Sequence, residues 1–115
     1  MSVSPNAKPG RGKRAPRING PFQGRRVGAL TTDLTVHDIS ITGCLIESFQ
    51  EVPAGRQMTI EIDLPSEGTV VLSAESVNTR PDFGFAVKFL DVPPQTRVRL
   101  ARFVFESLKK PTPDE

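Results

Sequence analysis

The feature that most constrains the fold is a regular alternation of apolar and polar residues in the second half of the chain. The clearest run has an apolar side chain at every second position: Met58, Ile60, Ile62 and Leu64. A later run has the same period: Phe83, Phe85, Val87 and Phe89. A period of two residues places one face of a strand against a core and the other in water. We therefore predict half-buried β strands over residues 58–64 and 83–89, with a less regular one over 69–79.

Shorter apolar runs extend the β pattern towards the N-terminus. Strand-like segments span residues 27–30, 34–39 and 44–48. We also expect turns at 19–21 and 23–24 and a bulge near His37. About six short strands with regular turn signals are typical of an antiparallel barrel or a curled sandwich.

The end of the chain breaks this pattern and predicts a helix over residues 95–109. Apolar residues recur there at spacings of three and four: Val98, Ala101, Val104, Phe105 and Leu108. Lys109 suits the C-terminus of a helix, and Pro111 ends it. Such a helix most often covers one end of a barrel, and the alternative is a helix that binds a partner protein. The predicted class is thus an all-β fold with a terminal helix.

Length and composition place this fold in a single domain. The chain has 115 residues, of which 37% are hydrophobic and 24% charged, as in a soluble globular domain. We expect a disordered basic tail at residues 1–12, one domain at 13–109 and a C-terminal tail at 110–115. No apolar run is long enough to span a bilayer, the N-terminus lacks a secretion signal, and Cys44 is the only cysteine. These features predict a cytoplasmic protein without membrane insertion.

The charges are distributed unevenly along the chain. Residues 1–26 contain seven Lys and Arg and no acid, whereas the remainder contains eight basic and thirteen acidic residues. A solvated tail explains the earliest of these cations. A second interpretation is an anion-binding site, because clustered guanidinium groups form paired hydrogen bonds with phosphates.

Catalytic and metal-binding functions have little support in the sequence. The chain has one His, one Cys and no Tyr or Trp. Cys44 opens an apolar strand and is interpreted as a small core residue, and His37 has no second His or Cys nearby to complete a metal site. No glycine-rich loop has the spacing of a phosphate-binding motif. We therefore expect no enzyme activity, no metal and no cofactor.

A polar bend at residues 38–43 is the strongest candidate for a binding site. A strand entering through residues 34–36 delivers Asp38 and Ser40 to this bend. Gly43 is expected to adopt a positive φ there, which a residue with a Cβ resists. Taken alone, Asp-x-Ser-x-x-Gly is equally consistent with a simple turn.

The basic arm gives this bend a partner. About twenty residues separate the arm from the bend, so one hairpin brings Lys13, Arg14 and Arg17 towards Asp38 and Ser40. Guanidinium groups bind phosphates and stack on purines, and a carboxylate accepts the N1 and N2 hydrogens of guanine. The residues indicate an anionic guanine nucleotide as ligand.

Three segments in this order resemble the PilZ family. They are Lys13-Arg14-x-x-Arg17, Asp38-x-Ser40-x-x-Gly43 and Gly84-Phe85-Ala86-Val87-Lys88-Phe89, and the resemblance spans about residues 13–108. It implies a six-stranded antiparallel β-barrel capped by a C-terminal helix. It also implies a bacterial receptor or adaptor for the second messenger cyclic di-GMP. Arg17 matches the second arginine of the family's Arg-x-x-x-Arg motif, and Asp38, Ser40 and Gly43 match its Asp/Asn-x-Ser-x-x-Gly motif.

The departure from the family pattern is Lys13, which stands at the first arginine and lacks its planar fork. With Arg14 beside it, the leading hypothesis is a weakened cyclic di-GMP receptor, binding one or two ligands, whose arm becomes ordered and signals to an effector protein. The second is a ligand-independent protein-interaction module of the pilus or motility machinery. The third, a nucleic-acid-binding barrel, is disfavoured because the strands do not interleave exposed aromatic and basic residues.

Overall fold

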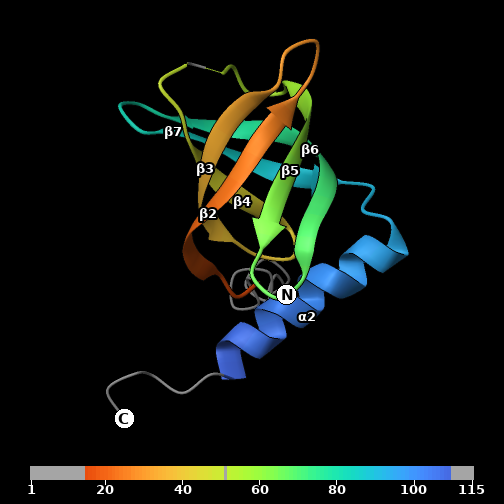
Figure 1. Ribbon diagram of the computed structural model, residues 1–115. Helices are drawn as coiled ribbons and strands as arrows, with labels where there is room; N and C mark the ends of the chain where they lie inside the picture. Colours follow the sequence, from red (N-terminus) through yellow and green to blue (C-terminus); the bar gives the residue numbers. More distant parts are fainter. Residues whose placement is uncertain (1–14, 51, 110–115) are drawn as a thin grey trace, which may run out of the picture.

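The computed structural model describes residues 15–50 and 52–109, and these form a closed antiparallel barrel with a helix across one end (Figure 1). The elements are β2 (Ile18–Val27), β3 (Thr32–Ile39), β4 (Gly43–Glu47), β5 (Gln57–Leu64), β6 (Gly68–Arg80), β7 (Gly84–Leu90) and α2 (Pro94–Lys109). Around the barrel the six strands follow the order β2-β3-β4-β7-β6-β5. The predicted fold class is confirmed. The predicted tails at 1–12 and 110–115 lie outside the described residues.

The alternating residues form the core, as their period requires. The side chains with the least exposure line the inside of the barrel: Val36, Ile39, Ile46, Ile60, Ile62, Leu72 and Ala74. The bulge expected near His37 is confirmed as a register shift between Val36 and Asp38 where β3 pairs with β4. This shift turns Asp38 to a new position relative to β4 without interrupting the strand.

The N-terminal strand is longer than the sequence predicts. The turns expected at 19–21 and 23–24 are wrong, because both lie within β2. The strand expected at 27–30 is wrong beyond Val27, since a loop follows it before β3 begins at Thr32. Closure of the barrel explains the difference: β2 pairs with β3 along most of its length and with β5 over its second half. Gly24 has strand partners on both sides, which override its turn preference. Gly20 and Pro21 lie in a register shift between Asn19 and Phe22, so they form an irregularity within the strand and not a turn that ends it.

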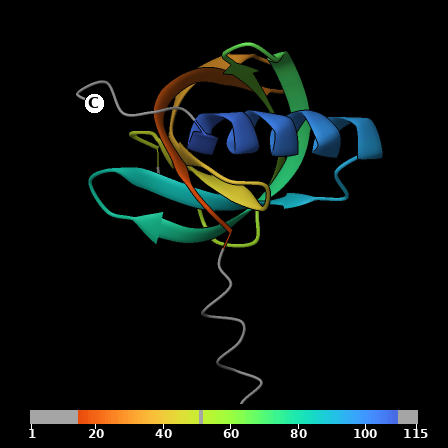
Figure 2. The ribbon, with the colours of Figure 1, turned by 90° about the horizontal axis from the view of Figure 1, so that it is seen from below.

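Helix α2 covers the end of the barrel, as expected (Figure 2), but it packs on the barrel with a different face from the predicted stripe. Leu100, Phe103 and Val104 are its buried residues. Phe103 packs edge-on against Phe22 of β2, with ring centroids 5.5 Å apart and an interplanar angle of 83°. Of the predicted stripe only Val104 is buried, and the other members are exposed: Val98, Ala101, Phe105 and Leu108.

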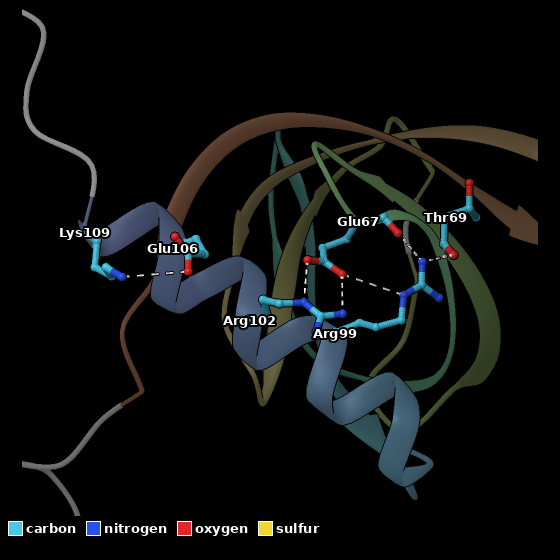
Figure 3. A network of polar contacts seen from close by, with 6 residues as sticks. All are labelled: Glu67, Thr69, Arg99, Arg102, Glu106 and Lys109. Atoms are coloured by element: carbon cyan, nitrogen blue, oxygen red, sulfur yellow. Dashed lines mark hydrogen bonds and ion pairs between the residues drawn. The ribbon is translucent and has the colours of Figure 1, made fainter.

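A cluster of ion pairs fixes α2 to the hairpin between β5 and β6 (Figure 3). The guanidinium of Arg102 donates from Nε and Nη2 to the two carboxylate oxygens of Glu67, at 2.8 and 3.0 Å. Arg99 donates to the main-chain oxygens of Glu67 and Thr69. The Glu67 side chain is 10% exposed and that of Arg102 is 53% exposed, so the hairpin holds the helix through charge-assisted bonds at the surface of the domain.

The Glu67 contact predicts a pH dependence of stability. The hydrogen bond from Arg102 lowers the pKa of Glu67 below its ordinary value of 4.5. A carboxylate with a lowered pKa stabilises the fold above the pKa of the unfolded chain, and this contribution is lost as the pH falls through the folded value. We expect Glu67→Gln to unfold at lower denaturant concentration at neutral pH. We also expect it to lose less of its remaining stability than the wild type between about pH 5 and pH 3.

Urea unfolding followed by circular dichroism at several pH values measures this difference. Asp63, whose pKa is lowered by hydrogen bonds from Thr69 and Arg25, remains in both proteins and accounts for the loss that persists in the variant. Parallel pH profiles for the two proteins would contradict the role given to Glu67.

Candidate ligand-binding site

The bend between β3 and β4 is held by the side chain of Ser40. The Ser40 N–H donates to the main-chain oxygen of Gly43 at 2.9 Å, which closes a tight connection through Ile41 and Thr42. The Ser40 hydroxyl accepts the N–H groups of Thr42 and Gly43 at 3.1 and 3.3 Å. Ser40 is 5% exposed, so these bonds satisfy a polar group that the barrel buries. Its first role is therefore to fix the shape of the bend.

Gly43 is required at this bend for a different reason from the one predicted. The expected positive φ is wrong, because among the described glycines only Gly55 and Gly68 have one. Gly43 begins β4 and pairs with Lys88 of β7. A Cβ at this position would lie 2.3 Å from the main-chain oxygen of Val87. The glycine thus allows two strands to approach closely.

Arg17 and Asp38 lie side by side at one edge of the bend. The pairing of Ile18 with Ile39 places the residue that precedes β2 next to the end of β3. The Arg17 Nη1 atom is 3.6 Å from Asp38 Oδ2, and the two side chains are 52% and 26% exposed. Both charged groups therefore remain accessible to a ligand. The other predicted cations, Lys13 and Arg14, lie outside the described residues.

A hollow of about 290 Å³ adjoins this pair and unites the predicted residues with others. Arg17, Asp38, Ser40 and Gly43 all line it. Thr42 of the bend also lines it, as do three polar side chains from outside the bend that were not predicted as site residues: Asn78, Arg80 and Lys88. Asn78 and Arg80 come from β6 and Lys88 from β7; β7 lies next to β4 in the barrel, and β6 follows β7. The hollow therefore combines three cationic side chains with one carboxylate, and polar amide and hydroxyl groups line it as well.

A larger hollow of about 660 Å³ lies elsewhere, between the loop after β2 and the loop after β4. Its charged residues are Arg26, Asp33 and Glu47. One cation beside two carboxylates gives no surplus of positive charge for a phosphate. Size alone thus does not make this hollow the better candidate for an anionic ligand.

Cys44 and His37 were the residues considered for catalysis and metal binding, and each has contacts that explain it in other ways. Burial raises the pKa of the Cys44 thiol to about 12, so the reactive thiolate is rare near neutral pH. His37 contacts Glu47 through Nε2, at 2.5 Å, and its ring packs against Phe83. Within residues 15–50 and 52–109, no three His, Cys, Asp or Glu side chains cluster to hold a metal ion. No helix in the same ranges has the length and apolarity to cross a membrane.

Comparison with protein families gives one match that covers most of the chain. The family model described as PilZ domain matches residues 12–106. Comparison with the curated proteins gives no match.

Solved structures that resemble the barrel and helix include three PilZ-containing or motility-related proteins. The PilZ domain of YcgR from Escherichia coli, solved with c-di-GMP, gives a TM-score of 0.66 at 18% identity, over 84% of this chain and 92% of that one. The PilZ domain of CeSA from a cellulose-synthesizing bacterium gives 0.63 at 14% identity, over 80% and 97%. The inhibitor of motility MotI/DgrA of Bacillus subtilis gives 0.67 at 14% identity, over 85% of this chain and 52% of that one. The chain thus spans about half of MotI/DgrA, and at these identities the likeness establishes the fold.

Proposed function

The chain belongs to the PilZ domain family, and from this premise we propose that it is a receptor for cyclic di-GMP in the bacterial cytoplasm. The observation that carries the proposal is the hollow shared by Arg17, Asp38, Ser40, Arg80 and Lys88. A binding role without catalysis fits this set, since it holds cations and hydrogen-bonding groups but no activated nucleophile.

Each part of the hollow suits one part of a cyclic guanine dinucleotide. The guanidinium of Arg17 is half exposed beside Asp38, where it reaches a phosphate or stacks on a purine. The Asp38 carboxylate accepts the N1 and N2 hydrogens of guanine. Arg80 and Lys88 add positive charge from strands β6 and β7. This charge balances the negative charge of the phosphates in any orientation of the ligand ring. Ser40 and Gly43 keep these groups in position.

We further propose that ligand binding orders the basic arm over the barrel and so signals to an effector protein. The arm continues directly into β2, and β2 contacts the covering helix through Phe22 and Phe103. In this proposal a change at Arg17 reaches α2 through strand β2. Lys13 and Arg14 complete the cation set of the arm in this proposal.

Isothermal titration calorimetry of the full chain with cyclic di-GMP tests the proposal, with GTP as the control for specificity. We expect binding at about 150 mM salt, so that screening removes weak nonspecific attraction. The stoichiometry distinguishes one ligand molecule from a stacked pair. Absence of heat with cyclic di-GMP in both the wild type and the arginine variant described next would reject the receptor function.

Lys13→Arg is expected to raise the affinity about tenfold. The substitution restores the planar fork that gives paired bonds to a phosphate and a face for stacking. One charge-assisted hydrogen bond contributes about 1.5 kcal/mol or more, which corresponds to about a tenfold change in Kd. The same titration measures it, with Lys8→Arg as a matched control that adds an arginine outside the family motif. An equal gain in both variants would show that position 13 has no special role.

The alternative function is a ligand-independent interaction module, and Lys13 is the feature that favours it. In that case Lys13→Arg shows no binding of cyclic di-GMP in the titration, while circular dichroism shows an intact barrel. The search for function would then turn to protein partners.

A further inference from the structure

The outer face of α2 carries an apolar stripe that the barrel does not use. Val98, Phe105 and Leu108 are 55%, 61% and 54% exposed, and Ala101 is exposed between them. The residues that pack on the barrel, including Leu100 and Phe103, lie on the opposite face. In Figure 2 no described part of the chain lies in front of the helix. We call the four exposed residues the outer seam.

The spacing of the outer seam is that of a coiled coil. Its members follow one another at intervals of three, four and three residues, which are the a and d positions of a heptad repeat. A stripe limited to these positions is narrower than the apolar face of a helix that packs on a globular core. Ala101, the smallest member, leaves room for a large side chain between Val98 and Phe105. The seam is therefore shaped to receive another helix.

The charges beside the outer seam select the kind of helix. Arg97, Arg102 and Lys109 occupy three of the four flanking e and g positions, and Val104 faces the barrel at the fourth. Lys109 lies 3.9 Å from Glu106 on the same helix, and Arg102 is bonded to Glu67 of the β5–β6 hairpin. Three cations thus face two acids beside the seam, and Arg97, which donates to the Val92 carbonyl and has no ion pair among the described residues, carries the surplus positive charge. A second copy of α2 would bring arginine and lysine against their own kind in either orientation, which opposes pairing. A helix with acidic flanks meets complementary charge.

We propose that the outer seam is a docking surface for an amphipathic helix of another protein, one whose own apolar a/d stripe is bordered by Asp or Glu. This inference goes beyond the receptor function and does not depend on it, because neither the seam nor its flanking cations line the dinucleotide hollow. It assigns to the domain a contact surface for an effector, at the end of the barrel that α2 covers.

A synthetic peptide of about three heptads, with Leu at a and d and Glu at e and g, tests the proposal. Fluorescence anisotropy of the labelled peptide is measured against the full chain without cyclic di-GMP, so the result is separate from the receptor test. We expect saturable binding that weakens as salt rises. A second peptide with Lys in place of Glu should bind at least about tenfold more weakly.

Substitutions on the protein locate the contact. Phe105→Glu and Val98→Glu should each weaken acidic-peptide binding by about tenfold or more, since they place a carboxylate in the seam. Leu30→Glu is the matched control, because Leu30 is 84% exposed on the loop after β2 and should leave binding unchanged. The exposed positions keep the fold intact, which thermal melts verify.

Three results would overturn the proposal. Equal binding of the acidic and basic peptides would show that the flanking cations do not select the partner. Equal binding of the acidic peptide by Phe105→Glu and by the wild type would show that the peptide does not bind at the outer seam. Sedimentation that shows a dimer abolished by Phe105→Glu, with no acidic-peptide binding to the wild type, assigns the seam to a second copy of the chain.

Discussion

Replacing Arg17 with alanine is expected to weaken cyclic di-GMP binding by at least ~100-fold while leaving the barrel folded. The substitution removes a phosphate contact of about 1.5–3 kcal/mol together with a stacking contribution of about 1 kcal/mol. These losses sum to roughly two to three decades in Kd. Arg17→Lys should retain part of the affinity, because lysine keeps the charge but not the planar face. Calorimetric titration of the three proteins measures the series.

The fold should tolerate Arg17→Ala because the residue contributes little to stability. Its ion pair with Asp38 is 3.6 Å long and half exposed, and such pairs are typically worth under about 1 kcal/mol. Arg26→Ala is the matched control, since it removes an equal charge from the larger hollow and should leave the affinity nearly unchanged. If both variants lose affinity equally, general attraction to a basic surface explains binding. If neither does, Arg17 is not part of the site.

The parts of the fold that the sequence predicts are those in which a local pattern reports burial directly. Strand β5 is the clearest case, since Met58, Ile60, Ile62 and Leu64 are all buried. Period-two alternation follows from one-sided burial, whatever the strand pairs with. The bend motif is likewise local: the bonds between Ser40 and Gly43 span three residues. These features depend on neighbours that the sequence shows side by side.

The remaining features depend on which strands become neighbours. Glycine and proline at residues 20–21 indicate a turn when read alone, but they lie in a register shift within β2, because Asn19 and Phe22 on either side of them both pair with β3. Arg80 and Lys88 join the hollow only because β7 and β6 follow β4 around the barrel. Nothing within their own segments marks them as binding residues.

The helix illustrates a further limit of pattern reading. Residues 95–109 contain two apolar faces, and the predicted stripe included Val104 but neither Leu100 nor Phe103, which pack on the barrel. The choice falls to Leu100, Phe103 and Val104, where Phe103 meets the ring of Phe22. The seam predicted as an apolar stripe is left outside. Tertiary packing determines which face of the helix is buried. The outer seam is left exposed as a result and is available for a partner.

Gly43→Ala is expected to destabilise the domain by about 2–3 kcal/mol, the upper range for adding a methyl group where a packed structure has no room. The new Cβ would lie 2.3 Å from the main-chain oxygen of Val87, a backbone atom held by the pairing of β4 with β7. Relief requires the two strands to separate, which also displaces Lys88 and the bend. We expect a fall in Tm of ~10–20 °C by circular dichroism and, at low temperature, weaker ligand binding.

Two further variants distinguish close strand approach from a requirement for positive φ. Gly28→Ala should be nearly neutral, because its Cβ would meet nothing nearer than 3.6 Å and its φ is not positive. Gly43→Asn separates the two explanations at the same position, since asparagine tolerates the left-handed region better than alanine does. Close approach makes asparagine at least as harmful as alanine, because both have a Cβ. A markedly milder effect of asparagine would restore the positive-φ interpretation, and the glycine of the bend would then serve its turn rather than the contact between β4 and β7.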